Sequence, residues 1–236
     1  EASCLEIGLE SLKKLIGSEE QNLYQSKKGK PSATRNDMII TQKSFNDICD
    51  LMSQSSDYRY YQMISDITKH KILKQKTSLP KKVFGNLSEK MLQVNLWLNR
   101  GYFESGLHYD TLDNFNLQVR GSKKFILYKP GMKNFYPRSM FTAKGHVSHV
   151  FNPNDYDKKK YPKLELANAE RYEVVLNAGE IIYLPHSWWH QVVSESEFNI
   201  NVNYWWLSPL KNLYYPRQTA SGLITILYRL ATGKFY

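Results

Sequence analysis

Two stretches of this sequence carry the residue types of a metal site. The first is Leu107-His108-Tyr109-Asp110, and the second is Trp188-Trp189-His190. Residues two apart on a β-strand project from the same face, so the side chains of His108 and Asp110 are expected to point the same way. If a distant strand brings His190 alongside, the three side chains can bind one face of an octahedral Fe(II) ion. The other positions of the ion then stay free for a co-substrate and O₂, so this spacing predicts a non-haem iron site.

Other histidines compete for the third ligand position. His186 lies four residues before His190, and His-x-x-x-His is a zinc-binding spacing when it falls on a helix. The proline of Leu184-Pro185 breaks a helix at this point, which favours His190 as the ligand. His146 and His149 fall in a polar segment and are expected at the surface or facing a substrate.

The elements that precede the first motif are a mixture of helix, loop and strand. Residues 1–16 read as a short amphipathic helix, and residues 17–35 are polar and read as a loop or link. Thr41 is expected to cap a helix that runs to about Met52. Residues 58–64 are strand-like, and a basic connector follows over residues 69–82.

From Met91 the hydrophobic period changes to two, which predicts a run of short strands. The turn signal Gly121-Ser122 predicts a hairpin between the strands on either side of it. Residues 129–170 form a long insert that we expect to pack over the mouth of a site. The strands are expected over residues 93–99, 108–110, 115–120, 123–128, 172–176, 181–184, 191–194 and 199–206.

Helical segments on both sides of these strands favour a mainly β fold with flanking helices. After Pro209 the pattern is helical again, with an apolar stripe between Gln218 and Thr232. That stripe fits packing against the protein's own core or self-association. The whole pattern predicts a β-barrel or a jelly-roll sandwich with helical additions.

The stretch Asn199-Ile200-Asn201-Val202-Asn203-Tyr204 gives one strand a face made only of amides. Asparagine is disfavoured in strands, so such a face needs a reason. It is either a solvent-facing sheet edge or the lining of a polar pocket. The nearby metal motif favours the pocket.

Composition limits the classes of protein to consider. The chain has 236 residues, of which 42% are hydrophobic and 23% charged, as expected of a globular protein with one large core or two small ones. The 32 basic and 22 acidic residues leave a net charge of +10, which raises the prospect of a nucleic-acid partner. The lysines are dispersed, however, and a solvated basic surface is slightly favoured.

The cellular compartment is indicated by three features that the sequence lacks: a disulfide framework, a membrane-spanning segment and a secretory signal. Cys4 and Cys49 give no disulfide framework and, having no histidine nearby, no structural zinc site. There is no apolar run of about 20 residues that would span a bilayer. Glu1-Ala2-Ser3-Cys4 does not open a secretory signal. We therefore expect a reducing compartment, cytoplasm or nucleus, and no membrane partner.

Taken together, the motifs resemble the JmjC (cupin-like) Fe(II)/2-oxoglutarate oxygenases of the small hydroxylase type, which includes protein asparaginyl and tRNA wybutosine hydroxylases. The resemblance covers roughly residues 58–208 and rests on an ordered set of motifs. These are His108-Tyr109-Asp110, Asn114-Phe115, Gln118, Gly121, Lys123, Tyr161-Pro162, the run Gly179 to Pro185, Trp188-Trp189-His190 and Asn203-Tyr204-Trp205.

This resemblance implies a double-stranded β-helix over residues 58–208, between an N-terminal extension (1–57) and a C-terminal helical tail (209–236). It implies that His108, Asp110 and His190 hold iron. Lys123 would bind the distal carboxylate of 2-oxoglutarate, although by itself it also reads as a solvated hairpin lysine like its neighbour. The other side chains implied are Ser105, Asn114, Asn203 and Tyr60 for 2-oxoglutarate, and Trp205 and Gln62 for substrate.

The activity implied is hydroxylation of a protein or peptide side chain, with O₂ consumed and succinate and CO₂ as co-products. A tRNA-base hydroxylase is the alternative, supported by the basic charge, and a histone or protein lysine demethylase comes third. A cupin-fold binding module without activity would require one metal ligand to be displaced. The resemblance also implies that a homodimer could form through the C-terminal helix.

Overall fold

A computed structural model describes residues 7–27, 39–54, 58–64, 66–131, 133–142, 144–208 and 215–232. Cys4 and the expectations for residues 1–6, 28–35 and 209–214 lie outside this part of the chain. Within it, no helix has both the length and the apolar character needed to cross a membrane.

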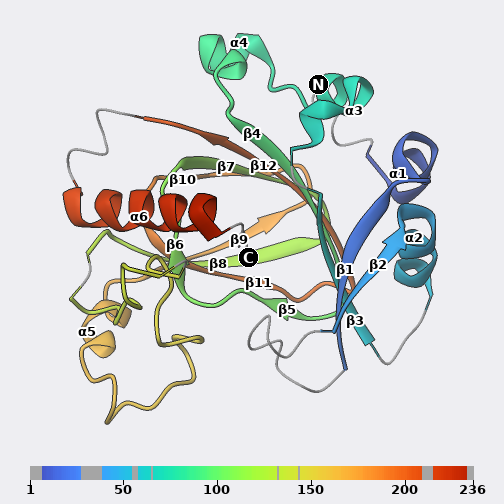
Figure 1. Cartoon of the computed structure of the whole chain (residues 1–236). Helices are drawn as coiled ribbons and strands as arrows, with labels where there is room; N and C mark the ends of the chain where they lie inside the picture. Colours follow the sequence, from blue (N-terminus) through green and yellow to red (C-terminus); the bar gives the residue numbers. More distant parts are fainter. Residues whose placement is uncertain are drawn as a thin grey trace.

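Strands make up most of the regular structure (Figure 1). They are β1 (Glu20–Lys27), β2 (Ile39–Ser44), β3 (Tyr58–Ile64), β4 (Gln93–Arg100), β5 (Phe103–Glu104), β6 (His108–Tyr109), β7 (Asp113–Arg120), β8 (Ser122–Tyr128), β9 (Tyr172–Asn177), β10 (Ile181–Leu184), β11 (Trp189–Ser194) and β12 (Phe198–Trp206). The helices are α1 (Leu9–Ile16), α2 (Phe45–Ser53), α3 (Lys71–Lys76), α4 (Lys81–Phe84), α5 (Leu164–Asn168) and α6 (Pro216–Thr232), with the 3₁₀ turns η3 (Ile67–Lys69) and η4 (Gly85–Glu89).

Two antiparallel sheets form the core of the molecule. The larger has the strand order β10-β7-β12-β4-β3-β1-β2, and the smaller has the order β5-β11-β8-β9 with β6 also paired to β11. The inner faces of the sheets meet, since Tyr61 of β3 stacks on Phe103 of β5 with 4.2 Å between ring centroids. The predicted jelly-roll is confirmed, as two open sheets rather than a closed barrel.

The predicted hairpin around Gly121 is wrong. β7 pairs with β10 and β12 in the larger sheet, whereas β8 pairs with β11 and β9 in the smaller one. Gly121 has φ +76°, and a Cβ there would lie 2.5 Å from the side-chain oxygen of Asn199. Only glycine fits this position, where the chain turns sharply and crosses from one sheet to the other.

Three expectations for the N-terminal part also need correction. The predicted loop contains β1, which is polar but pairs with β2 and β3, so sheet pairing outweighs its weak strand propensity. The following helix begins at Phe45, and the hydroxyl of Ser44 caps it by accepting a hydrogen bond from the Asp47 amide at 3.2 Å. Thr41 lies in β2 instead. The basic connector contains the short helices α3 and α4.

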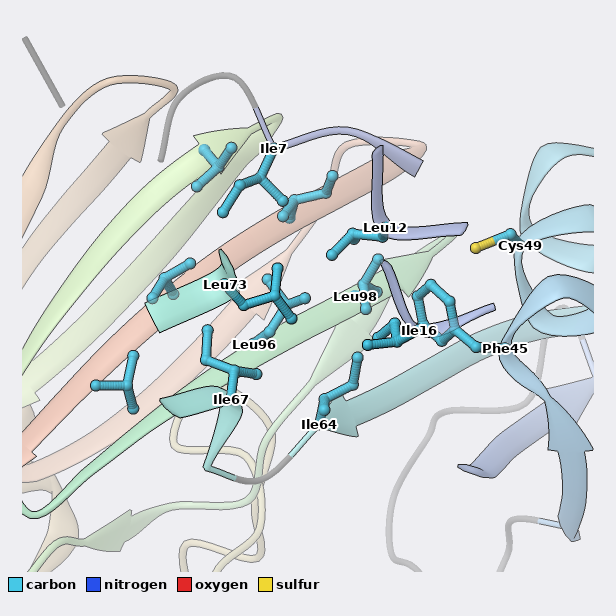
Figure 2. Packing of buried hydrophobic residues seen from close by; sticks show 14 of the residues in the cluster. Ile7, Leu12, Ile16, Phe45, Cys49, Ile64, Ile67, Leu73, Leu96 and Leu98 are labelled. Atoms are coloured by element: carbon cyan, nitrogen blue, oxygen red, sulfur yellow. The ribbon is translucent and has the colours of Figure 1, made fainter. Parts of the chain in front are cut away.

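Helices α1 and α2 cover the outer face of the larger sheet (Figure 1). Apolar side chains of these helices pack against the outward-facing side chains of the strands (Figure 2). This cluster includes Leu12, Ile16, Phe45, Ile48, Cys49 and Met52 from the helices, and Tyr60, Ile64, Leu96 and Leu98 from the sheet. This largest hydrophobic cluster therefore lies outside the jelly-roll interior, whereas a smaller one with Phe125 and Leu127 lies on the inward face of β8.

The inner face of the larger sheet is polar. Register pairs Asn201 of β12 with Trp97 of β4 and with Gln118 of β7, so the alternate residues of these strands share the inner face. All three asparagines of β12 are buried, and the solvent-edge interpretation is therefore wrong. We call the buried inward side chains the amide face; it consists of Asn95, Asn99, Asn114, Asn116, Gln118, Asn199, Asn201 and Asn203.

Candidate metal centre

The structure brings the three predicted metal ligands together. β6 and β11 run antiparallel with His108 directly opposite His190, and their ring centroids lie 4.3 Å apart. Asp110 follows the end of β6, and its Oδ2 lies 3.9 Å from Nε2 of His190. One ligand atom from each residue falls within 4.8 Å of the other two. These two nitrogens and one oxygen are close enough together to bind a single metal ion.

Backbone carbonyls orient both imidazoles. Nδ1 of His108 lies 2.7 Å from the carbonyl oxygen of Gly106, and Nδ1 of His190 lies 3.0 Å from that of Trp188. A carbonyl can only accept, so each Nδ1 carries a proton, and in the neutral ring Nε2 is then the nitrogen with the lone pair. This second-sphere arrangement fixes the tautomer that a metal needs.

Burial keeps His190 in the form that binds metal. Its pKa is lowered to about 4, chiefly by burial and next by the neighbouring His108, although Asp110 acts in the opposite direction. The imidazole is therefore neutral near pH 7. A metal ion would not have to displace a proton from it.

His186 is absent from the cluster. Its backbone N–H donates to Oδ1 of the buried Asp113 at 3.0 Å, and its ring lies against Tyr215. Of the insert histidines, His149 is exposed, whereas the ring of His146 makes an edge contact with Tyr109. The insert itself packs beside the metal motif, as expected, through a bridge between Val147 and His108.

Lys123 lies on the same face of the smaller sheet as His190. β8 and β11 pair Lys123 with Ser194 and Leu127 with His190, which places both side chains inward. Lys123 is only 8% exposed, and burial lowers its pKa to about 7. Among the described residues no carboxylate pairs with it, so its ammonium is a buried cation that can receive an anion. The neighbouring Lys124 points the other way and binds Glu173 at 2.7 Å, so the solvated interpretation is wrong for Lys123.

Ser105 lies between the metal ligands and Lys123. Its amide donates to the carbonyl of Val192 at 2.9 Å, and its hydroxyl accepts from the amide of Val192 at 2.9 Å. Val192 lies midway between His190 and Ser194 on β11. Because the hydroxyl oxygen accepts the backbone N–H, its hydrogen can be donated to a ligand.

Asn114 and Trp205 border the metal ligands from the opposite sheet. They pair across β7 and β12, and Nδ2 of Asn114 donates to Oδ2 of Asp110 over 3.4 Å. Oδ1 of Asn114 and Nε1 of Trp205 are buried, and neither finds a partner within the described residues. Oδ1 of Asn114 can therefore accept a hydrogen bond from a bound ligand, and the indole N–H of Trp205 can donate one.

A chain of amides sets the orientation of Asn203. The backbone N–H of Asp66 can only donate, and it donates to Oδ1 of Asn95 at 3.0 Å. The amide nitrogen of Asn95 therefore faces Asn203 and donates to its Oδ1 at 3.0 Å. It follows that Asn203 turns its own NH₂ group away from Asn95, into the interior. We call these two hydrogen bonds the amide relay.

The structure separates Tyr60 and Gln62 from the site. Side chains alternate along β3, and Tyr60 lies in the outer, helix-covered cluster. Tyr61 pairs with Asn99 and stacks on Phe103, so it occupies the inner face that was expected for Tyr60. The sequence Arg59-Tyr60-Tyr61-Gln62 offers two adjacent tyrosines, and only the register of β3 against β4 distinguishes them.

Comparison with known proteins agrees with this architecture. The profile of a family described as "Cupin-like domain" matches residues 10–212. Lysine-specific demethylase JMJ31 of Arabidopsis thaliana is 33% identical over 147 residues, which cover 58% of this chain and 26% of that protein. Human tRNA wybutosine-synthesizing protein 5 is 38% identical over 99 residues, which cover 42% of this chain and 29% of that protein.

A solved structure, that of E. coli ycfD, superposes with a TM-score of 0.53 over 98% of this chain and 52% of its own, at 13% identity. That likeness concerns the fold alone. The match of the family profile covers most of the chain and includes every strand of both sheets. This chain therefore belongs to the cupin-like, JmjC-type domain family.

Proposed function

We propose that this protein is an Fe(II)- and 2-oxoglutarate-dependent oxygenase that hydroxylates a side chain of a protein or peptide. The observation that carries the proposal is the buried ammonium of Lys123, on the same sheet face as His190 and with no carboxylate partner among the described residues. A metal site alone fits many functions. A metal site with a buried cation beyond it fits a ligand that chelates the metal at one end and carries a carboxylate at the other.

The donor set fits iron. Two imidazole nitrogens and one carboxylate oxygen match the facial triad of non-haem Fe(II) enzymes. When bound, iron and 2-oxoglutarate would supply the oxidation, in which 2-oxoglutarate and O₂ are converted to succinate and CO₂ as a C–H bond is hydroxylated. His108, Asp110 and His190 would hold the ion, and the carbonyls of Gly106 and Trp188 keep the imidazoles in the binding tautomer.

The polar groups beyond the metal fit 2-oxoglutarate. Lys123 would pair with the distal carboxylate, and the Ser105 hydroxyl would donate to it. The NH₂ group of Asn203 and the amide of Asn114 would orient the end nearer the metal. Desolvation disfavours the charged form of Lys123 in the free protein, and an incoming carboxylate would reverse this effect.

Trp205 supports the choice of a peptide substrate. Its indole N–H is buried without a partner in the described structure, next to the equally unpartnered Oδ1 of Asn114. A peptide or side-chain amide offers both complementary atoms, a carbonyl acceptor and an N–H donor. Gln62 faces the other side of the sheet and is not included in this surface.

A tRNA base is the second candidate substrate. The chain resembles tRNA wybutosine-synthesizing protein 5, and seven lysines with one glutamate lie between residues 69 and 90. The Arabidopsis relative is named as a lysine-specific demethylase, which keeps demethylation as the third candidate.

The substrate proposal is tested by measuring which macromolecule stimulates succinate formation. We expect a peptide library to raise the rate above the uncoupled level at ordinary salt. Stimulation by tRNA alone, with binding that weakens steeply as salt increases, would replace the peptide by the tRNA proposal. Formaldehyde release from methylated peptides would point to demethylation.

The amide relay predicts a specific loss when Asn95 is replaced by aspartate. The carboxylate would still accept from the Asp66 amide, but it cannot donate to Asn203. The Asn203 amide would then turn round and present its oxygen to the co-substrate. We expect affinity for 2-oxoglutarate to fall by about ten- to a hundredfold, as measured by calorimetry with Mn(II) in place of iron.

Asn99→Asp is the matched control for this change. Asn99 lies on the same strand and the same amide face, but its NH₂ group binds the carbonyl of Gly101 at 3.2 Å. An equal loss in both variants would show that a new charge, and not the orientation of Asn203, weakens binding.

Self-association through α6 remains a prediction. Leu223 and Leu227 lie one helical turn apart and are 56% and 64% exposed, so they form an uncovered apolar strip. We expect Leu223→Lys with Leu227→Lys to convert a dimer to a monomer in light scattering. The same mass for both proteins would exclude a dimer held by this strip.

A further inference from the structure

Helix α6 docks on the metal centre through polar residues. Among the α6 residues whose burial the structure describes, Gln218, Ser221 and Gly222 are buried, whereas the apolar Leu223 and Leu227 are exposed. In Figure 1 the helix lies across the end of the molecule where β6 and β10 are labelled. A helix usually buries apolar side chains, so the buried polar side chains of Gln218 and Ser221 need a reason.

The backbone around Asp110 depends on contacts outside the strand ladders. β6 ends at Tyr109 and β7 begins at Asp113, so Asp110 lies between strands. Its carbonyl accepts a hydrogen bond of 2.7 Å from the amide of Ser187, in the loop before β11. Ser187 has φ +68°, a left-handed conformation that is uncommon for a residue other than glycine.

Gln218 holds this loop in place. Its Nε2 donates to the carbonyl of Ser187 at 2.7 Å, and the bond is buried. Two hydrogen bonds therefore link α6 to Asp110 through Ser187. The Ser187 carbonyl accepts from Gln218, and the Ser187 amide donates to the Asp110 carbonyl. Without Gln218 the Ser187 carbonyl would remain buried and unpaired, which favours a shift of the loop.

Gly222 brings the helix backbone against the same segment. A Cβ at this position would lie 2.1 Å from Cγ2 of Thr111, the residue after Asp110. No such approach is tolerated between carbon atoms, so Gly222 is the residue that lets α6 reach Thr111. The helix thus contacts two segments that adjoin the backbone of Asp110: the Ser187 loop, whose amide donates to the Asp110 carbonyl, and Thr111, the next residue in the chain.

We propose that α6 is part of the metal centre and that Gln218 is a positioning residue for Asp110, acting through Ser187. This inference rests on the proposed binding of metal by His108, Asp110 and His190. Outer-sphere partners of metal ligands typically change metal affinity by about 10- to 100-fold when they are removed. Gln218 reaches Asp110 through one further hydrogen bond, so we expect a loss near the lower end, about tenfold.

The test is a Co(II) titration of Gln218→Met, a side chain of similar length that cannot donate. We expect about tenfold weaker binding and an altered visible Co(II) spectrum, because the carboxylate would bind in a changed geometry. Thermal unfolding of the metal-free proteins would check that the variant is folded. Arg217→Met, at an exposed position next to Gln218 on α6, is the control and should bind Co(II) like the wild type.

A second pair of variants keeps the inference testable if Gln218→Met is unstable. Gly222→Ala should favour the helix by its propensity yet weaken Co(II) binding, because the new methyl group displaces Thr111. Adding Thr111→Ser removes Cγ2, the Thr111 atom nearest the new methyl group, and should restore part of the binding. Wild-type affinity and spectrum in both Gln218→Met and Gly222→Ala would overturn the inference, whereas a wild-type protein that binds no Co(II) would overturn the proposed function instead.

Discussion

Replacing Asp110 by alanine is expected to abolish stoichiometric metal binding and any turnover of 2-oxoglutarate. The substitution removes the carboxylate ligand of the His108-Asp110-His190 cluster and leaves two imidazoles with ring centroids 4.3 Å apart. Loss of an outer-sphere partner already weakens metal binding by about 10- to 100-fold, so loss of a ligand should exceed about 100-fold. The measurement is calorimetric titration of Mn(II) or anaerobic Fe(II) into the metal-free protein.

Asp155→Ala is the control for this prediction. Asp155 is an exposed carboxylate in the insert and is absent from the metal cluster. It should bind metal like the wild type. If Asp110→Ala kept the wild-type affinity and stoichiometry, the metal would have to lie elsewhere in the protein.

Replacing Lys123 by methionine is expected to have opposite effects on binding and on stability. Affinity for 2-oxoglutarate should fall by about 100-fold, since the distal carboxylate would be buried without its cation. The free energy of unfolding of the ligand-free protein at pH 7 should stay equal or rise, because the variant no longer buries an amine that has no carboxylate partner in the described part of the chain. Calorimetry and urea denaturation measure the two quantities separately.

The pKa of Lys123 also predicts a pH dependence. Burial lowers it to about 7 from the ordinary value of 10.5. Between these two pH values the unfolded chain binds one more proton than the folded protein, so this lysine makes the free energy of unfolding rise with pH in that window. Binding of a dianion requires the charged form, so 2-oxoglutarate should bind with proton uptake above pH 7 and lose up to about tenfold in affinity per pH unit.

Lys124→Met is the control that shows whether loss of any positive charge on β8 would have the same effect as Lys123→Met. Lys124 is adjacent on β8 but faces Glu173 on the other side of the sheet. It should leave 2-oxoglutarate affinity and its pH dependence unchanged. Equal losses in the two variants would contradict the assignment of Lys123 to the co-substrate.

Much of the site could be predicted because it depends on local spacing. His108 and Asp110 are two residues apart next to a strand, and a proline excludes the helical pairing of His186 with His190. The period-two pattern likewise identified the strands from residue 91 onward, except the short β5. Lys123 was separated from Lys124 only by resemblance to a family, since both read locally as hairpin lysines.

The sequence-based predictions failed where the structure depends on strand register, or on a pairing with an element far away in the sequence. In β3, alternation puts Tyr61 inside and Tyr60 outside, and a shift of one residue exchanges them. At Gly121 the turn signal was read correctly, but no local signal shows that the next strand joins the other sheet. In α6 the sequence shows an apolar stripe, whereas two of the described residues that contact the segments beside Asp110 are Gln218 and Gly222.

The most direct test of the account is succinate formation from 2-oxoglutarate, with Fe(II) and O₂, by the wild type and by Asp110→Ala. We predict slow turnover without substrate in the wild type and none in the variant. Simple absence of the true substrate could keep that turnover low, so metal and 2-oxoglutarate binding should be measured on the same samples. A wild-type protein that binds neither would contradict the oxygenase and leave a cupin-fold binding module in its place.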